Sequence, residues 1–206
     1  MQIFLDLDGT LLDSSRRHVI LLEKILSEKN IDADVTNYID YKNDGFSTKK
    51  YLTEFLGMSK DVSNDIATLW VQNIENDEFL VDDKLYEDTI EALEYFKSYV
   101  DKMYLVTARN NHKGVTDTLD RLGITKYFDD IVVVSPANAS YEKCNYIKAK
   151  MNENDILIGD TEVEYEISKV LGIKTYLLNR GFRSKAFWDD KGIKSYNSLN
   201  DIKGCI

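Results

Sequence analysis

Two aspartates near the beginning of the chain, Asp6 and Asp8, are the first residues whose type and spacing point to chemistry. They lie where a short apolar run, Ile3 to Leu7, gives way to Gly9 and Thr10, which turn the chain. Side chains two positions apart on an extended chain leave it on the same side, so the two carboxylates repel each other unless a proton or a cation relieves them. A hard divalent cation such as Mg²⁺ prefers oxygen ligands of this kind.

A second acidic group and a set of anion-binding groups follow later apolar runs. In the segment ILIGDTEVE, Asp160 comes directly after such a run and Glu164 lies about one helical turn further on. In the segment VTAR, Thr107 and Ala108 offer a hydroxyl and backbone N–H groups to an anion, and Lys143 adds a positive charge. A nucleophile, an acid, a metal and donors for the equatorial oxygens are the parts that phosphoryl transfer requires.

The acidic and anion-binding residues can act together only if a sheet brings the strand ends before them close to one another. The apolar runs predict such a sheet. Most of the later runs are separated by helical patterns, which predicts an α/β fold with a doubly wound, Rossmann-like parallel sheet. In such a sheet the ligand crevice lies beyond the carboxyl ends of the strands. The predicted strands are Ile3 to Leu7, Met103 to Val106, Ile131 to Val134, Ile156 to Ile158 and Thr175 to Leu178.

The interval between the first and second predicted strands behaves differently, because residues 14–83 show only helical periodicity. Apolar residues recur there at helical spacing in three stretches, which predicts a small bundle of about four helical elements. We therefore expect an α/β core domain made of residues 1–13 and 84–206 and an inserted helical domain made of residues 14–83.

Composition excludes several classes of function. The chain of 206 residues carries a formal net charge of −10, which disfavours binding to a nucleic acid polymer or to an anionic membrane surface. Its cysteines, Cys144 and Cys205, are too few for a disulfide framework, and no run is apolar enough for a transmembrane helix. We expect a cytoplasmic protein with a small-molecule partner, as a monomer or a small homo-oligomer.

The segments DLDGTLLDS, LVTAR and ILIGDTEVE, with a lysine between the last two, resemble the four motifs of the haloacid dehalogenase-like hydrolase superfamily. The resemblance spans the chain and is closest to the phosphatase branch with a helical cap inserted after the first motif, as in phosphoglycolate phosphatase and beta-phosphoglucomutase. It implies that Asp6 is the nucleophile and Asp8 the general acid and base. It also implies that Asp6, the backbone carbonyl of Asp8 and Asp160 hold Mg²⁺, and that Thr107 and Lys143 bind the phosphoryl group.

The sequence departs from the family pattern at the fourth motif and before it. Glu164 stands where the family often has aspartate, so it is either a metal ligand or a neighbour of the ligands. Lys143 precedes Asp160 by seventeen residues, closer than is usual, and Lys148 and Lys150 compete with it for the phosphate-binding role. We favour Lys143, because the other two lie nearer the end of the predicted helix.

Three basic residues and a histidine stand beside the motifs without a fixed role. Arg109 either contacts the substrate or pairs with an acidic neighbour. Arg16, Arg17 and His18 are expected to form an exposed basic turn, from which Arg16 could reach a substrate. Phe182 is expected to pack the C-terminal segment.

The predicted function is a Mg²⁺-dependent phosphatase that hydrolyses a small soluble phosphomonoester through an aspartyl-phosphate intermediate. Sugar phosphates, phosphoglycolate-like acids and nucleoside monophosphates are all small enough to fit beneath a closing cap. A phosphomutase would use the same core. A receiver-like signalling module is a further alternative, although such modules place their phosphorylated aspartate after the third strand, where this chain has Val134, Ser135 and Pro136.

Overall fold

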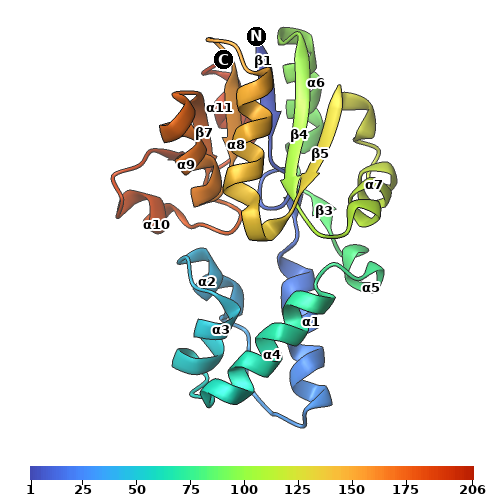
Figure 1. Cartoon of the computed structure of the whole chain (residues 1–206), viewed down its shortest axis with the longest axis vertical. Coiled ribbons are helices and arrows are strands. Elements are labelled where there is room, and N and C mark those ends of the chain that lie inside the picture. Colours follow the sequence, from blue (N-terminus) through green and yellow to red (C-terminus); the bar gives the residue numbers. More distant parts are fainter.

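The core of the protein is a six-stranded parallel sheet with the strand order β5-β4-β1-β6-β7-β8, seen in a computed structural model that describes residues 1–206 (Figure 1). The first strand lies in the middle, with Phe4 opposite Tyr104 on one side and Leu157 on the other. Because the strand order runs outward in both directions from β1, the sheet is doubly wound, as predicted. The strands are β1 (Gln2–Leu5), β4 (Lys102–Ala108), β5 (Asp130–Val134), β6 (Ile156–Gly159), β7 (Lys174–Leu178) and β8 (Ser195–Tyr196).

Helices cover both faces of this sheet because both faces of its central strands are apolar. Ile3 and Leu5 point into the larger core cluster, which α6, α7 and α11 close, whereas Phe4 points into a second cluster beneath α8 and α9. No helix of the protein is both long enough and apolar enough to cross a membrane. The bounds are α6 (Thr89–Tyr99), α7 (His112–Arg121), α8 (Ala139–Lys150), α9 (Glu162–Leu171), α10 (Lys185–Asp189) and α11 (Leu199–Lys203).

A helical insertion, residues Ser15 to Leu80, lies beyond the carboxyl ends of the strands (Figure 1). It has its own apolar core, to which α1 contributes Leu21, Leu22 and Ile25, and this core is separate from those of the sheet. The elements are α1 (Ser15–Glu28), α2 (Tyr38–Asn43), α3 (Thr48–Lys50), the π-helical turn η1 (Tyr51–Phe55), α4 (Lys60–Asn73) and α5 (Asp77–Leu80).

The two chain segments that join the insertion to the core run side by side. Leu12 pairs with Leu85 and Asp13 with Lys84, so that β2 (Leu12–Asp13) and β3 (Lys84–Leu85) form a small antiparallel sheet. These strands and β8 were not predicted, because a strand of two residues is too short to show a hydrophobic period.

Candidate active site

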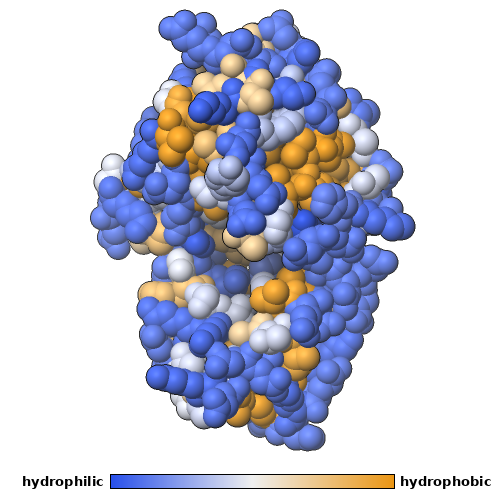
Figure 2. All heavy atoms as spheres, in the orientation of Figure 1, coloured by the Kyte–Doolittle hydropathy of each residue, from blue (hydrophilic) through white to orange (hydrophobic).

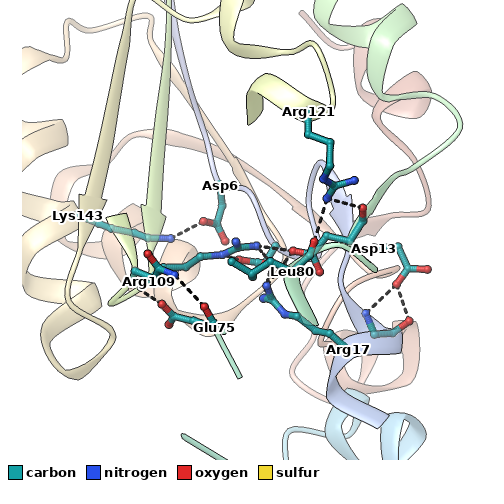
Figure 3. Close-up of polar contacts among 12 residues, drawn as sticks. Asp6, Asp13, Arg17, Glu75, Leu80, Arg109, Arg121 and Lys143 are labelled. Carbon is teal, nitrogen blue, oxygen red and sulfur yellow. Dashed lines mark hydrogen bonds and ion pairs between the residues drawn. The ribbon is translucent and has the colours of Figure 1, made fainter. Parts of the chain in front are cut away.

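Asp6 follows the central strand directly and is held between the strand ends. Its backbone N–H donates to the carbonyl of Ile158 in β6, and the residue is 8% exposed. The ammonium Nζ of Lys143, from α8, lies 2.8 Å from Oδ1 of Asp6 (Figure 3). The same Nζ lies 2.8 Å from Oε1 of Glu164. The buried lysine therefore joins the first motif to the fourth, while Lys150 reaches outward to Asp130.

Glu164 is fully engaged by these contacts. Its Oε2 accepts hydrogen bonds from the backbone N–H and the hydroxyl of Thr161, which completes the capping box at the start of α9. A methyl group on Gly159 would lie 2.2 Å from Cγ of Glu164, so the strand end is also packed tightly against this side chain. The structure thus places Glu164 as the residue that holds Lys143.

Asp160, at the end of β6, lies in a narrow cradle of backbone. Its Oδ1 accepts from the hydroxyl of Thr10 at 3.2 Å, and its Oδ2 accepts from the backbone N–H of Phe182 at 2.7 Å. A Cβ atom at Gly9 or at Gly181 would lie 2.2 Å from Oδ2. Gly9 also has a φ of +76°, which a side chain would strain. Glycine at both positions lets the two loops close around the carboxylate.

The electrostatics of these carboxylates fit a divalent cation. Burial raises the pKa of Asp6 to about 6 against the opposing pull of Lys143, and burial followed by the charge of Asp6 raises the pKa of Asp160 well above its usual value. Asp160 has no cationic side chain as a partner. A pair of carboxylates of which one, Asp160, has no cationic partner is an all-oxygen donor set of the kind that Mg²⁺ prefers. No three acidic, histidine or cysteine side chains form a metal cluster, so a cation here would complete its shell with backbone oxygen and water.

Asp8 is clasped by two arginines, in what we call the arginine clasp (Asp8, Arg17, Arg109 and Asp83). Arg109 donates from Nε to Oδ2 and from Nη2 to Oδ1 of Asp8, both at 2.7 Å, and Arg17 donates from Nη2 to Oδ1 at 2.8 Å. Both guanidinium groups also reach Oδ2 of Asp83, at 2.8 Å and 2.9 Å (Figure 3). Arg121 donates to the backbone carbonyl of Asp83 and so holds the segment before β3 in place.

The clasp fixes the charge state of Asp8. Burial alone would raise its pKa, but the charges of Arg109 and Arg17 outweigh burial and hold the pKa of Asp8 well below its usual range. A general acid, the role that the family resemblance implies for Asp8, has to hold a proton, whereas the arrangement in the structure stabilises the carboxylate of Asp8. For Arg109, the structure shows pairing with acidic neighbours.

The basic turn after the first motif is not exposed as a whole, so that expectation was wrong for two of its residues. Arg17 is 4% exposed and His18 is 6% exposed, because the first turn of α1 packs into the junction between the insertion and the core. Only Arg16 lies outward, where its exposed guanidinium pairs with Asp82. The structure therefore does not bring Arg16 to the other candidate residues.

Thr107 and Ala108 end β4, the strand next to β1. The last pair in the register between the strands is Leu5 with Leu105, so Thr107 lies just beyond it, level with the loop that carries the aspartates. Thr107 is 1% exposed, and the backbone N–H of Arg109 is already used by the carbonyl of Val134. The strand end is thus fixed beside Asp6.

A cavity of about 350 Å³ opens where the insertion meets the core, at the level of the recess in the space-filling view (Figure 2). Phe182 lies between the two parts: its backbone holds Asp160 and its ring contacts His18 with 4.8 Å between centroids. It was expected to pack the C-terminal segment, and that expectation was wrong. The cavity is lined by His18, Lys42, Gly45, Phe46, Ser47, Thr161, Phe182 and Arg183.

Sequence reasoning missed the residues that act at a distance along the chain. Each of these residues contacts a partner far away in the sequence. Thr10 contacts Asp160, Asp83 contacts Arg17, and Lys42 lies over the ring of Trp70. For Thr10 the signal was its place in DLDGT, and for Gly181 it was a glycine shortly after a predicted strand. Nothing in the sequence singles out Asp83 among its acidic neighbours.

Comparison with known proteins agrees with this geometry. Residues 3–178 match the family described as haloacid dehalogenase-like hydrolase. The chain is 29% identical over 190 residues to phosphoglycolate phosphatase of Aquifex aeolicus. The aligned region covers 87% of this chain and 85% of that protein.

Solved structures share the fold over nearly the whole chain. A haloacid dehalogenase-like family protein from Streptococcus pneumoniae superposes with a TM-score of 0.78 at 20% identity and covers 99% of this chain and 97% of the other. A crystal structure described as a predicted phosphoglycolate phosphatase from Haemophilus somnus gives a TM-score of 0.72 at 18% identity, with 99% and 96% covered. The matched family, the parallel sheet and the acidic strand ends agree, and the chain belongs to the haloacid dehalogenase-like hydrolase family as an enzyme of its phosphatase branch.

Proposed function

We propose that this enzyme is a Mg²⁺-dependent phosphatase that hydrolyses a small phosphomonoester through a phosphoryl group carried on Asp6. The contact of Lys143 with Oδ1 of Asp6 is the observation that carries this proposal. It supports a carboxylate that is ionised although it is buried, and it leaves Oδ2 as the attacking atom. The Aquifex aeolicus relative supports the same class of reaction.

In the first half of the proposed reaction, Oδ2 of Asp6 forms a bond to phosphorus while the bond from phosphorus to the ester oxygen breaks. The ester oxygen takes a proton from Asp8 and leaves as an alcohol. In the second half, Asp8 takes a proton from water, whose oxygen attacks phosphorus and releases inorganic phosphate from Asp6. Each half returns Asp8 to the state that the other half needs.

The remaining groups of the site hold the phosphoryl group. In this proposal Lys143, the hydroxyl of Thr107 and the backbone N–H of Ala108 donate to its oxygens; the contact of Lys143 with Asp6 and the position of Thr107 and Ala108 at the end of β4 support these roles. Mg²⁺, held by Asp6, Asp160 and the carbonyl of Asp8, would offset the negative charge that the substrate brings. Without such a cation, the like charges of two buried carboxylates and a phosphate dianion would oppose binding.

The arginine clasp adds a condition to this sequence of steps. The ion pairs with Arg17 and Arg109 favour the carboxylate form of Asp8, which is the form that would activate water. The protonated form is favoured only when Arg17 and Arg109 loosen their hold, since both guanidinium groups stabilise the charge. We therefore propose that the clasp opens before the ester oxygen is protonated.

Phosphate release from a panel of small phosphomonoesters tests the proposal. Wild type is compared with Asp6→Asn, in Mg²⁺ and in chelator, and Asp117→Asn serves as a matched control because Asp117 is exposed on α7 and pairs only with Lys113. We expect Mg²⁺-dependent release by wild type and by the control, and none by Asp6→Asn. Equal release by Asp6→Asn would refute the role of Asp6. Consumption of a substrate without phosphate release, followed by ³¹P NMR, would show a mutase instead.

A further inference from the structure

The cavity between the insertion and the core is positively charged, although the protein as a whole is acidic. Its lining contains the cations Lys42 and Arg183 and no aspartate or glutamate, and burial lowers the pKa of the third basic residue, His18, well below its usual value. The chain carries 36 acidic residues against 26 lysines and arginines, so a basic pocket without an acidic residue stands out against its background. A pocket of this charge favours an anion.

Lys42, on α2, is the cation of this pocket that lacks a counter-ion. Its ammonium lies over three aromatic rings, 4.9 Å from the centroid of Trp70, 5.6 Å from that of Tyr38 and 5.9 Å from that of Phe182, and no carboxylate lies within ion-pair distance. Burial, followed by the charge of Arg183, lowers the pKa of Lys42 to about 8. The rings stabilise the ammonium in part, and its charge stays unpaired.

The other two basic residues of the pocket do not add an unpaired positive charge. Arg183 is neutralised by Glu162, whose Oε2 lies 2.6 Å from its Nε. His18 is buried, and its Nδ1 has no hydrogen-bond partner. The pocket therefore offers one unpaired ammonium and one unpartnered ring nitrogen.

The pocket also adjoins the phosphoryl-transfer groups. Thr161 is next to Asp160 in sequence, and the backbone N–H of Phe182 donates to Oδ2 of Asp160. A substrate whose phosphate lies at Asp6 and Asp160 would extend its leaving group toward this lining. We propose that Lys42 determines specificity by pairing with a second anionic group, a carboxylate or a second phosphate, on the leaving group of the substrate.

This inference rests on the proposed phosphatase activity and narrows its substrate class. A leaving group that carries an anion gives Lys42 the counter-ion that it lacks, whereas a neutral alcohol of the same size leaves the ammonium unpaired. A charge-assisted hydrogen bond contributes enough to change binding by about tenfold or more. Among small phosphomonoesters, the pocket thus selects those with a second anion.

Matched esters test the inference. Phosphoglycolate and 2-hydroxyethyl phosphate have the same carbon skeleton and differ in a carboxylate against a hydroxyl, and ethane-1,2-diol bisphosphate carries a second phosphate instead. Selectivity is the ratio of kcat/KM for an anionic ester to kcat/KM for 2-hydroxyethyl phosphate. It is measured for wild type, Lys42→Met, Lys42→Arg and the control Lys49→Met, since Lys49 is an exposed lysine of the same insertion.

We expect the selectivity to fall about tenfold or more in Lys42→Met, to recover largely in Lys42→Arg and to stay at the wild-type value in Lys49→Met. The anionic ester whose selectivity falls further identifies carboxylate or phosphate as the recognised group. An unchanged ratio in Lys42→Met would overturn the inference. If the ratio is unchanged because kcat/KM falls equally on all esters, Lys42 has a purely structural role.

Binding of phosphonates separates this inference from the proposed activity. If wild type hydrolyses none of the esters, the proposed function fails, and calorimetry with phosphonoacetate and methylphosphonate then decides the question for the pocket. Tighter binding of phosphonoacetate that is lost in Lys42→Met would support an anion site. Equal affinity for the two phosphonates would overturn it.

Discussion

Replacement of Gly181 by alanine would place a methyl group against Asp160. The new Cβ would lie 2.2 Å from Oδ2 of Asp160 and 2.5 Å from Cα of Gly9, whereas ordinary contact begins at 3.4 Å. Asp160 is fully buried, so its carboxylate or the loop at Gly9 would have to retreat by about 1 Å. A misplacement of about 1 Å can lower an enzymatic rate about 100-fold, and overpacking of this kind costs about 1–3 kcal/mol of stability.

We therefore expect Gly181→Ala to lose about 100-fold in kcat/KM and to need more Mg²⁺ for half-maximal rate, because an oxygen of Asp160 is displaced. The assay is phosphate release against Mg²⁺ concentration, with urea unfolding to measure the free energy of unfolding. Gly204→Ala is the matched control, since a Cβ there meets nothing within 4 Å and its φ is −73°. A variant that keeps kcat/KM within about threefold of wild type, with an unchanged Mg²⁺ requirement, would refute the cradle as the support of Asp160.

Three further perturbations follow from the buried charges. Lys143→Met leaves Asp6 without its cation, and urea unfolding should show a loss of about 3–5 kcal/mol; a loss below about 1 kcal/mol would contradict the buried bridge. Arg17→Met should lower the free energy of unfolding by a similar amount. Arg16→Met, on the surface, is the control and should change it by less than about 0.5 kcal/mol. Equal effects of the two substitutions would contradict the clasp. Burial raises the pKa of Asp83 to about 6, so the stability that comes from its protonation is present at low pH and is lost as pH rises through about 6. From pH 5 to pH 7, wild type should thus lose about 1 kcal/mol of stability relative to Asp83→Asn, and a difference that is constant with pH would exclude this titration.

The sheet and the order of its motifs were predictable because each depends on a local pattern. Short apolar runs between helical stretches specify parallel strands, and the segments DLDGT and IGDTEVE mark where two of those strands end. The helix that carries Lys143 follows from its own periodicity, so its place above the sheet was predictable. These features depend on residues that are neighbours in sequence.

The arginine clasp and the Lys42 pocket were not predictable, because they depend on which distant segments meet. Arg17 reads as part of an exposed basic turn, and only its contacts with Asp8 and Asp83 from other segments bury it. Lys42 reads as a surface lysine of a short helix until Trp70 and the core loop at Phe182 enclose it. Long-range pairing decided the burial of these charges, and no local period encodes it.

The arginine clasp also determines which residues of the helical insertion can be exchanged for those of a relative. Arg17 lies just after β2 and Asp83 just before β3, whereas Asp8 and Arg109 belong to the core. In a chimera that exchanges residues 14–83 for the helical insertion of a relative, Asp8 would lose its ion pair with Arg17 and Arg109 would lose its ion pair with Asp83. The exchangeable module is therefore smaller than residues 14–83, because Arg17 and Asp83 have to stay with Asp8 and Arg109 if the chimera is to fold with Asp8 in its present surroundings.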